Sequence, residues 1–180
     1  DKEVDKTFKQ AKILIETKGI YYLDSKDEKM KLTDPRVKLI IPSMTDLGNR
    51  GLAAVCEGLG IRSEALNVSN AETLQLGRGV TTCKECLPMI LCVGSMLQYI
   101  KHRKDPDEKL VVFQPRAAGY CRMGQYHSFM NMLIRERKLK DIALIALSNE
   151  ERYAGLGTAF ALNAWKATLI SDVMDDIRGA

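Results

Sequence analysis

Leu110-Val111-Val112-Phe113 decides the fold, because consecutive β-branched and aromatic apolar residues predict a strand. Val37-Lys38-Leu39-Ile40-Ile41, which ends at Pro42, is a second β-rich run. Residues 142–147 predict a further strand, and residues 62–68 predict a weaker one. The rest of the fold follows from what lies between these runs.

Helical patterns separate the predicted strands. In residues 46–59, Leu52, Val55, Cys56 and Leu59 share one helical face, and Gly60 follows as the expected terminator. The other expected helices cover residues 70–77, 88–100, 123–137 and 150–177. Strands that alternate with such helices predict βαβ units, a mostly parallel sheet and helices on both of its faces. We therefore expect an α/β domain in three layers over residues 37–180.

The first 36 residues have a different pattern. Residues 3–18 alternate charged with apolar side chains, which predicts a helix of moderate quality. Residues 24–36 are charged and contain Asp34-Pro35, a loop signal. The sequence thus predicts an N-terminal helix and linker over residues 1–36, with the compact core beginning at Val37.

Composition excludes several classes of protein. The 27 basic and 23 acidic residues give a net charge of only +4 and are interspersed, which argues against nucleic-acid binding. No apolar run approaches the roughly 18 residues of a membrane span, and the charged start at Asp1-Lys2-Glu3 does not resemble a signal peptide. Five unevenly spaced cysteines are not typical of a disulfide scaffold. We expect a cytoplasmic protein whose cysteines bind metal or act as catalytic thiols.

Cys86 and Cys121 stand out by position. Pro88 is tolerated in the first turn of a helix, so Cys86 is expected at or just before a helix start. Cys121 follows the strand at Leu110–Phe113 and precedes the next helix. In a parallel sheet these positions share one edge, and helix amino termini favour the thiolate. The pattern indicates a reactive or metal-bound cysteine pair without deciding between the two.

The remaining cysteines and the histidines have simpler interpretations. Cys56 and Cys92 are expected to pack in the core. Cys83 and Cys86 form a C-x-x-C spacing, which occurs in both metal and redox sites. His102 lies in a basic segment expected to be a solvated helix end, and His127 is interpreted as structural.

Two motifs together resemble a known family. Lys84-Glu85-Cys86-Leu87-Pro88, with Gly94 following, is similar to the Gly-Lys-Glu-Cys-Leu-Pro segment of proteins related to 2-hydroxyacyl-CoA dehydratase activases. Cys121-Arg122-Met123-Gly124-Gln125-Tyr126 resembles their second signature, Cys-Arg-Phe-Gly-Gln-Tyr. The resemblance covers about residues 37–147.

The resemblance implies a dehydratase-like domain with a Rossmann-like α/β fold that holds a [4Fe–4S] cluster. Cys86 and Cys121 are the ligands it implies. The resemblance leaves the source of the third ligand undecided. The candidates are Cys83, a segment outside this sequence and another chain. The resemblance also marks the surroundings of the cluster as Lys84, Glu85, Arg122, Gln125 and Tyr126. No phosphate-binding G-x-x-x-x-G-K-[ST] motif is found, so ATP hydrolysis is not expected here.

In such a system an activase ATPase passes one electron to the dehydratase, which eliminates water from a 2-hydroxyacyl-CoA. The implied partners are the activase ATPase domain or a dehydratase-like domain of the same parent chain or complex, with an acyl-CoA as substrate. Two other functions remain open. One is a scaffold domain that docks the ATPase, and the other is a thiol–disulfide protein that uses Cys83 and Cys86.

Overall fold

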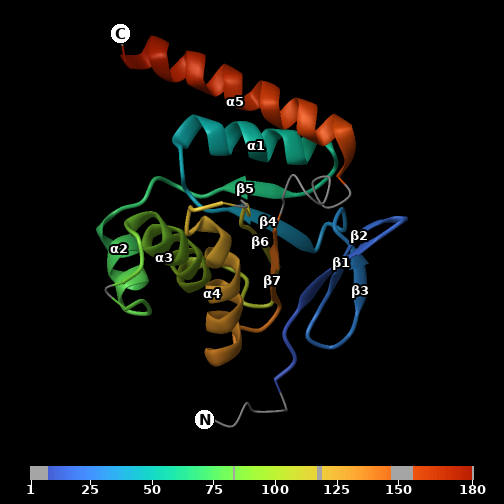
Figure 1. Cartoon of the computed structure of the whole chain (residues 1–180). Helices are drawn as coiled ribbons and strands as arrows, with labels where there is room; N and C mark the ends of the chain where they lie inside the picture. The colour runs from blue at the N-terminus through green and yellow to red at the C-terminus, as the bar shows by residue number, and fades with distance from the viewer. Residues whose placement is uncertain (1–7, 83, 117–118, 147–155, 180) are drawn as a thin grey trace.

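The computed structural model describes residues 8–82, 84–116, 119–146 and 156–179. Figure 1 shows its helices and strands in their spatial arrangement. In chain order they are β1 (Lys12–Glu16), β2 (Gly19–Leu23), β3 (Lys29–Lys31), β4 (Val37–Ile41), α1 (Asp46–Gly58), β5 (Ser63–Ala65), α2 (Ala71–Arg78), α3 (Leu87–His102), β6 (Lys109–Phe113), α4 (Met123–Glu136), β7 (Ile142–Ile145) and α5 (Gly157–Gly179).

The centre of the molecule is a parallel sheet with the strand order β5-β4-β6-β7. Leu39 pairs with Ser63 on one side of β4 and with Val111 on the other, and every pairing in this sheet is parallel. The prediction of an α/β fold with a parallel sheet is confirmed. The predicted helices and strands of residues 37–146 are present, with ends that differ by a few residues.

The two faces of this sheet bury different side chains, because successive residues of a strand point to opposite sides. In β6, Val112 faces the cluster that contains α3 and α4, whereas Val111 faces the cluster that contains α1. Both residues are fully buried. Helices therefore cover both faces, as expected from right-handed crossovers.

The predicted N-terminal helix is wrong. The described part of that segment forms β1, β2 and β3, an antiparallel sheet with the strand order β1-β2-β3. Gly19, with φ of +133°, ends the turn between β1 and β2, and burial in β2 alternates with a period of two. Ile15 and Ile20 then pair across the hairpin, where β-branched residues pack well. This hairpin pairing, together with burial of Tyr22 in the same cluster as residues of the parallel sheet, outweighs the helical spacing of the same apolar residues.

The core does not begin at Val37. Tyr22, Met30 and Leu32 belong to the same buried cluster as Val111 and Ala143 of the parallel sheet. Strand β1 also contacts β7, so the small sheet covers part of one face of the large sheet. The linker predicted for residues 24–36 contains β3 and contributes to this packing.

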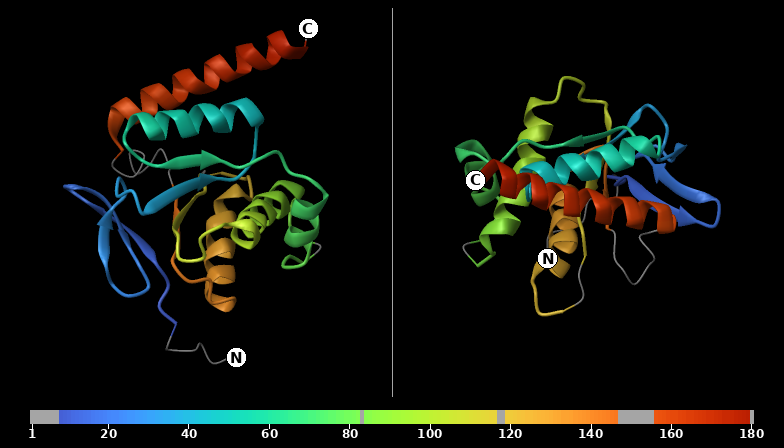
Figure 2. Two further views of the ribbon diagram at one scale, coloured as in Figure 1. Left: turned by 180° about the vertical axis from the view of Figure 1, so that it is seen from behind. Right: turned by 90° about the horizontal axis from the view of Figure 1, so that it is seen from above.

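Helix α5 lies on the outer side of α1 (Figures 1 and 2). Its contacts with the rest of the fold are mainly with α1, and Ala167 and Ser171 approach Gly51 of that helix. The predicted terminator of α1, Gly60, has φ of +77°, which favours glycine. Within the described ranges, none of the helices is both long and apolar enough to span a membrane.

Candidate functional site

The strand order creates one place where a ligand site is expected. From β4, the chain crosses first to β5 on one side and later to β6 on the other side. At such a switch of direction, the crevice outside the carboxyl ends of the strands is the usual ligand site of open α/β sheets. The loops that follow β4 and β6 border it. Cys121 lies in the loop after β6, and Cys86 begins the helix that leads into β6.

Cys86 is the residue that caps the amino end of α3. Its backbone is extended, with φ of −71° and ψ of 149°, and its carbonyl accepts a hydrogen bond from the N–H of Ile90 at 3.2 Å. Pro88 stands in the first turn, as the sequence predicted. The thiol is partly exposed, whereas Met89 and Ile90 beside it are buried. The helix thus fixes this sulfur at its amino end.

Tyr126 joins the two motifs. It lies in the first turn of α4, its ring is buried in the cluster between α3 and α4, and its hydroxyl oxygen is 2.7 Å from the sulfur of Cys86. The resemblance alone marks Tyr126 as one of the residues around the site and gives it no role. The structure gives it a direct contact that spans 40 positions of the chain.

The environment of Cys86 favours its ionised form. Partial burial opposes ionisation, but the hydrogen bond with Tyr126, the backbone N–H of Met89 and the charge of Arg122 outweigh it, so the pKa of the thiol is lowered. The pKa of Tyr126 is raised, first by burial and then by its interaction with Cys86. In the ionised pair the tyrosine hydroxyl therefore donates to the sulfur. A thiolate is the form that binds metal and attacks electrophiles.

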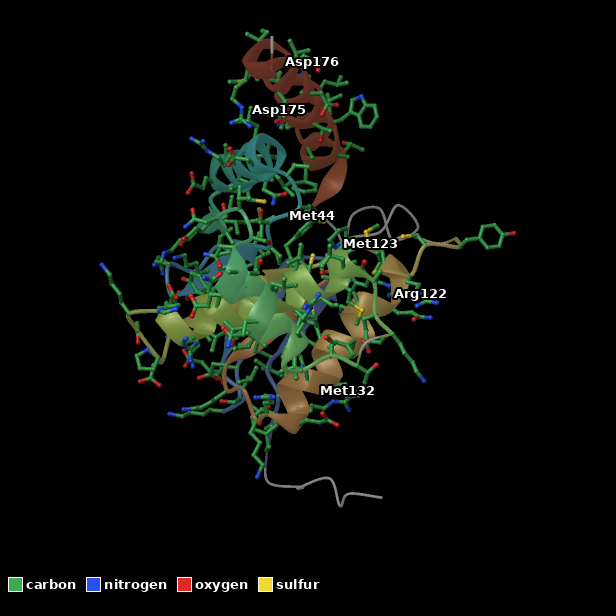
Figure 3. All side chains as sticks on the ribbon, turned by 90° about the vertical axis from the view of Figure 1, so that its left-hand side faces the viewer. Met44, Arg122, Met123, Met132, Asp175 and Asp176 are labelled. Carbon is green, nitrogen blue, oxygen red and sulfur yellow. The ribbon has the colours of Figure 1, made fainter. Side chains whose placement is uncertain are left out.

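Cys121 and Arg122 bring the second motif to the first. Arg122 donates from Nη1 to the carbonyl oxygen of Lys84 at 2.9 Å, which ties the start of α4 to the segment before α3. Figure 3 shows Arg122 and Met123 at this end of α4. Cys121 is exposed. The Cys86 thiol contacts Tyr126, and Cys121 lies next to Arg122 in the segment that leads into α4.

The other predicted site residues differ in how closely they approach the sulfur. The carboxylate of Glu85 accepts hydrogen bonds from the Thr82 hydroxyl at 3.0 Å. Gln125 is exposed, and its backbone N–H donates to the carbonyl of Arg122. Among the described residues, neither side chain forms a hydrogen bond with Cys86. Cys83 lies outside the described residues.

Cys56 and Cys92 are core residues, as predicted. Each is 2% exposed, and burial raises the pKa of each thiol to about 11. Their sulfurs therefore remain protonated at neutral pH. This contrast makes Cys56, on the opposite face of the sheet from Cys86, a suitable control position.

The chemistry of the donors fits iron–sulfur ligation in part. Cysteine thiolates are the usual ligands of such clusters, and the surroundings of Cys86 favour that form. Over the part of the chain that is described, no group of three or more histidine, cysteine, aspartate or glutamate side chains is arranged to hold a metal ion. Cys83 lies outside the described part of the chain. The described residues therefore include two of the candidate ligands, Cys86 and Cys121.

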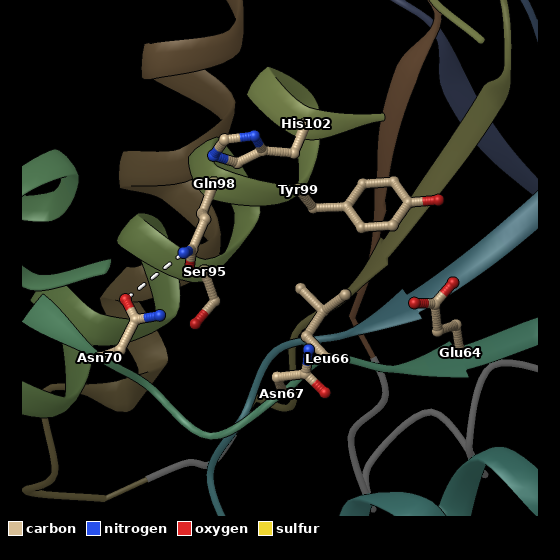
Figure 4. Close-up of a pocket in the computed structure, with 8 residues that line it drawn as sticks. All are labelled: Glu64, Leu66, Asn67, Asn70, Ser95, Gln98, Tyr99 and His102. Carbon is tan, nitrogen blue, oxygen red and sulfur yellow. Dashed lines mark hydrogen bonds between the residues drawn. The ribbon is translucent and has the colours of Figure 1, made fainter. Parts of the chain in front are cut away.

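A separate polar pocket was not foreseen from the sequence. It has a volume of about 220 Å³ and lies between the segment after β5 and α3 (Figure 4). Gln98 donates to Asn70 at 3.4 Å on its wall, and the Ser95 hydroxyl is buried without a hydrogen-bond partner among the described residues. His102 is exposed, as predicted, and it also borders this pocket and contacts Glu72 at 2.9 Å. The residues come from two distant segments, so no local pattern could reveal them.

Comparisons of the chain with protein-family models, with curated proteins and with solved structures give no match. The functional argument therefore rests on the residues of the two motifs and on the geometry that surrounds Cys86.

Proposed function

We propose that this chain is an iron–sulfur-binding domain of the Rossmann-like, dehydratase type, related to the activators of 2-hydroxyacyl-CoA dehydratases. In this role it acts in electron transfer or radical dehydration. The observation that supports the proposal best is the contact between Tyr126 and Cys86, because it favours a thiolate at the amino end of α3. Cys121 at the start of the next helix supplies the second thiol.

Five residues in or next to the two motifs have a part in this proposal. Cys86 and Cys121 bind iron as thiolates, and Cys83 is the candidate for a third ligand. The Tyr126 hydroxyl donates to the Cys86 sulfur, and such hydrogen bonds tune the reduction potential of iron–sulfur sites. Arg122 adds positive charge near the thiolate. A bound [4Fe–4S] cluster would supply one-electron chemistry.

The proposed partners follow from the same resemblance. They are an activase ATPase domain or a dehydratase-like domain of the same parent chain or complex, with an acyl-CoA as the proposed substrate. In a related alternative, the domain docks the ATPase as a scaffold and binds no cluster.

Anaerobic reconstitution with iron and sulfide tests the proposal. The wild-type protein is expected to acquire the visible absorption of a cluster and, after reduction, an electron paramagnetic resonance signal. Cys86→Ala and Cys121→Ala are each expected to lose both, and Cys83→Ala tests the third ligand. Cys56→Ala is the matched control, because that thiol is buried on the other face of the sheet. A wild-type protein that folds and binds no iron would overturn the proposal.

A thiol–disulfide function is the second candidate, and one observation favours it. The lowered pKa of Cys86 also suits a nucleophilic thiol, since C-x-x-C at a helix start is a redox arrangement. Titration with thiol–disulfide buffers separates the two functions. A reversible Cys83–Cys86 disulfide without iron binding would favour this candidate. Absence of both signals in a folded protein would favour the scaffold.

A further inference from the structure

Helix α5 is apolar on the side that faces away from the rest of the fold. Its inner side carries small residues, and Ala167 and Ser171 lie close to Gly51 of α1. Its outer side carries large apolar side chains that are 50–72% exposed. We call this the α5 outer face; it consists of Leu162, Trp165, Leu169, Ile170, Val173, Met174 and Ile177. A surface helix of a globular protein normally has the opposite arrangement.

The α5 outer face is large enough for a stable interface. Spacings of three and four residues align Leu162, Trp165, Leu169, Val173 and Ile177 along one stripe. Seven such side chains, each at least half exposed, present on the order of 800 Å² of surface, which is about what one partner contributes to an interface of standard size. Monomeric proteins rarely expose contiguous apolar patches of this extent.

A groove continues the α5 outer face toward α1. It has a volume of about 590 Å³ and is lined by Ile170 and Met174 of α5, by Val55 of α1 and by Leu59, which follows α1. Large apolar side chains of an adjoining helix can enter such a groove. In Figures 1 and 2 α5 forms one margin of the molecule, and the parallel sheet lies beyond α1.

The charges beside the apolar stripe indicate that the partner on the α5 outer face is a second copy of the same helix. Lys166 lies in the first half of α5, and Asp172 and Asp176 lie in the second half, where Figure 3 shows Asp176 near the end of the helix. Within the described residues, none of the three takes part in an ion pair, whereas Asp175 is paired with Arg178. An antiparallel copy of α5 brings Lys166 near the two aspartates of the other chain, twice by symmetry. A parallel copy places like charges together.

We propose that two copies of this chain form a two-fold symmetric dimer in which the α5 outer faces pack antiparallel on each other. The contact is isologous, so each copy contributes the same apolar stripe. Each copy also contributes both the lysine and the two aspartates of the proposed ion pairs. The dimer does not depend on the proposed iron–sulfur function.

The chain contains one tryptophan, so Trp165 fluorescence reports directly on this face. Analytical ultracentrifugation of the wild-type chain is expected to reach the mass of a dimer and no higher. Its fluorescence emission should shift to shorter wavelength as the dimer forms. Leu169→Asp is expected to raise the Kd by about a hundredfold or more, because burying an unpaired carboxylate is costly. Met132→Asp, on an exposed apolar residue of α4, is the matched control and should leave the Kd unchanged.

A charge exchange tests the antiparallel orientation. Lys166→Glu should weaken the dimer, and adding Asp172→Lys and Asp176→Lys to the same chain should restore it. Circular dichroism checks that each variant keeps its fold. A wild-type chain that stays monomeric with solvent-exposed Trp165 emission at its highest soluble concentration would overturn the proposal. A dimer that Leu169→Asp leaves unchanged would also overturn it.

Discussion

The hydroxyl oxygen of Tyr126 lies 2.7 Å from the sulfur of Cys86, and the contact joins the first turn of α4 to the amino end of α3. The tyrosine ring is buried between these helices, so the hydroxyl is held in place rather than free to follow solvent. The same contact lowers the pKa of Cys86 and raises that of Tyr126. The pKa of this thiol therefore depends on the packing of α3 against α4.

Tyr126→Phe is expected to raise the pKa of Cys86. The variant keeps the ring and loses the hydrogen bond to the thiolate, and an upward shift of roughly one pH unit corresponds to about 1.4 kcal/mol. The measurement is the pH dependence of Cys86 alkylation, followed peptide by peptide with mass spectrometry. Tyr120→Phe removes a hydroxyl from a fully exposed ring and should leave the profile unchanged. Identical profiles for Tyr126→Phe and wild type would show that the contact does not influence the thiol.

Arg122→Gln is expected to shift the same profile upward by less than Tyr126→Phe. The guanidinium favours the thiolate by its charge alone, and it is exposed, so solvent weakens the interaction. Arg122→Lys keeps the charge and should restore most of the wild-type profile. A shift that lysine does not restore would assign the effect to the hydrogen bond with the Lys84 carbonyl instead.

Gly94→Ala is expected to destabilise the fold by about 1–3 kcal/mol, because added volume in a tight contact forces the backbone apart. A Cβ at Gly94 would overlap the carbonyl oxygen of Thr73 in α2, and a Cβ at Gly77 would overlap that of Ile90 in α3. Urea unfolding measures the loss for both variants. Gly58→Ala is the control, since open space surrounds that position and alanine favours a helix. Its stability should be unchanged or higher.

Lys109→Met is expected to cost about 3–5 kcal/mol, because it leaves two buried carboxylates without their cation. The Lys109 ammonium lies 3.1 Å from Asp24 and 2.8 Å from Asp141, which are both 2% exposed. Urea unfolding at neutral pH measures the loss. Lys29→Met breaks an exposed pair with Glu16 and should cost no more than about 1 kcal/mol. Equal losses of unfolding free energy in the two variants would contradict the larger stabilisation that we expect from the buried cluster.

The same cluster predicts a pH dependence. Burial alone would raise the pKa of Asp24 and Asp141, but hydrogen bonds, including those from Lys109, outweigh burial and lower both. The stability that these carboxylates contribute is therefore complete above the unfolded pKa of about 3.9 and is lost as the pH falls through their folded values. In Lys109→Met the buried carboxylates have lost their cation, so burial favours their protonated form. The difference in unfolding free energy from wild type should therefore narrow as the pH falls toward about 4 and continue to narrow below it.

Local pattern was enough to predict much of residues 37–146. Apolar runs such as Leu110–Phe113 form strands wherever a sheet can bury them, and Pro88 limits where α3 can start. The position of Cys86 at that start follows from the same local rule. The interpretation of Cys56 and Cys92 as core residues was also correct, because each shares a helical face with larger apolar side chains.

Local pattern gave the wrong structure for a segment whose conformation depends on burial against another part of the chain. Residues 12–23 have apolar side chains that suit a helix, yet pairing between β1 and β2 and burial of Tyr22 against the parallel sheet favour strands. The strand order and the polar pocket beside Ser95 likewise depend on which elements become neighbours.

The sequence by itself therefore determined the alternation of strands and helices in the parallel sheet and the place of Cys86 at a helix start, since both depend on residues a few positions apart. Only the tertiary structure decided that Tyr126 contacts Cys86, that Lys109 joins two aspartates and that α5 turns its apolar side outward. These features depend on contacts between residues far apart in the chain, whose free energy is gained only when whole elements pack together.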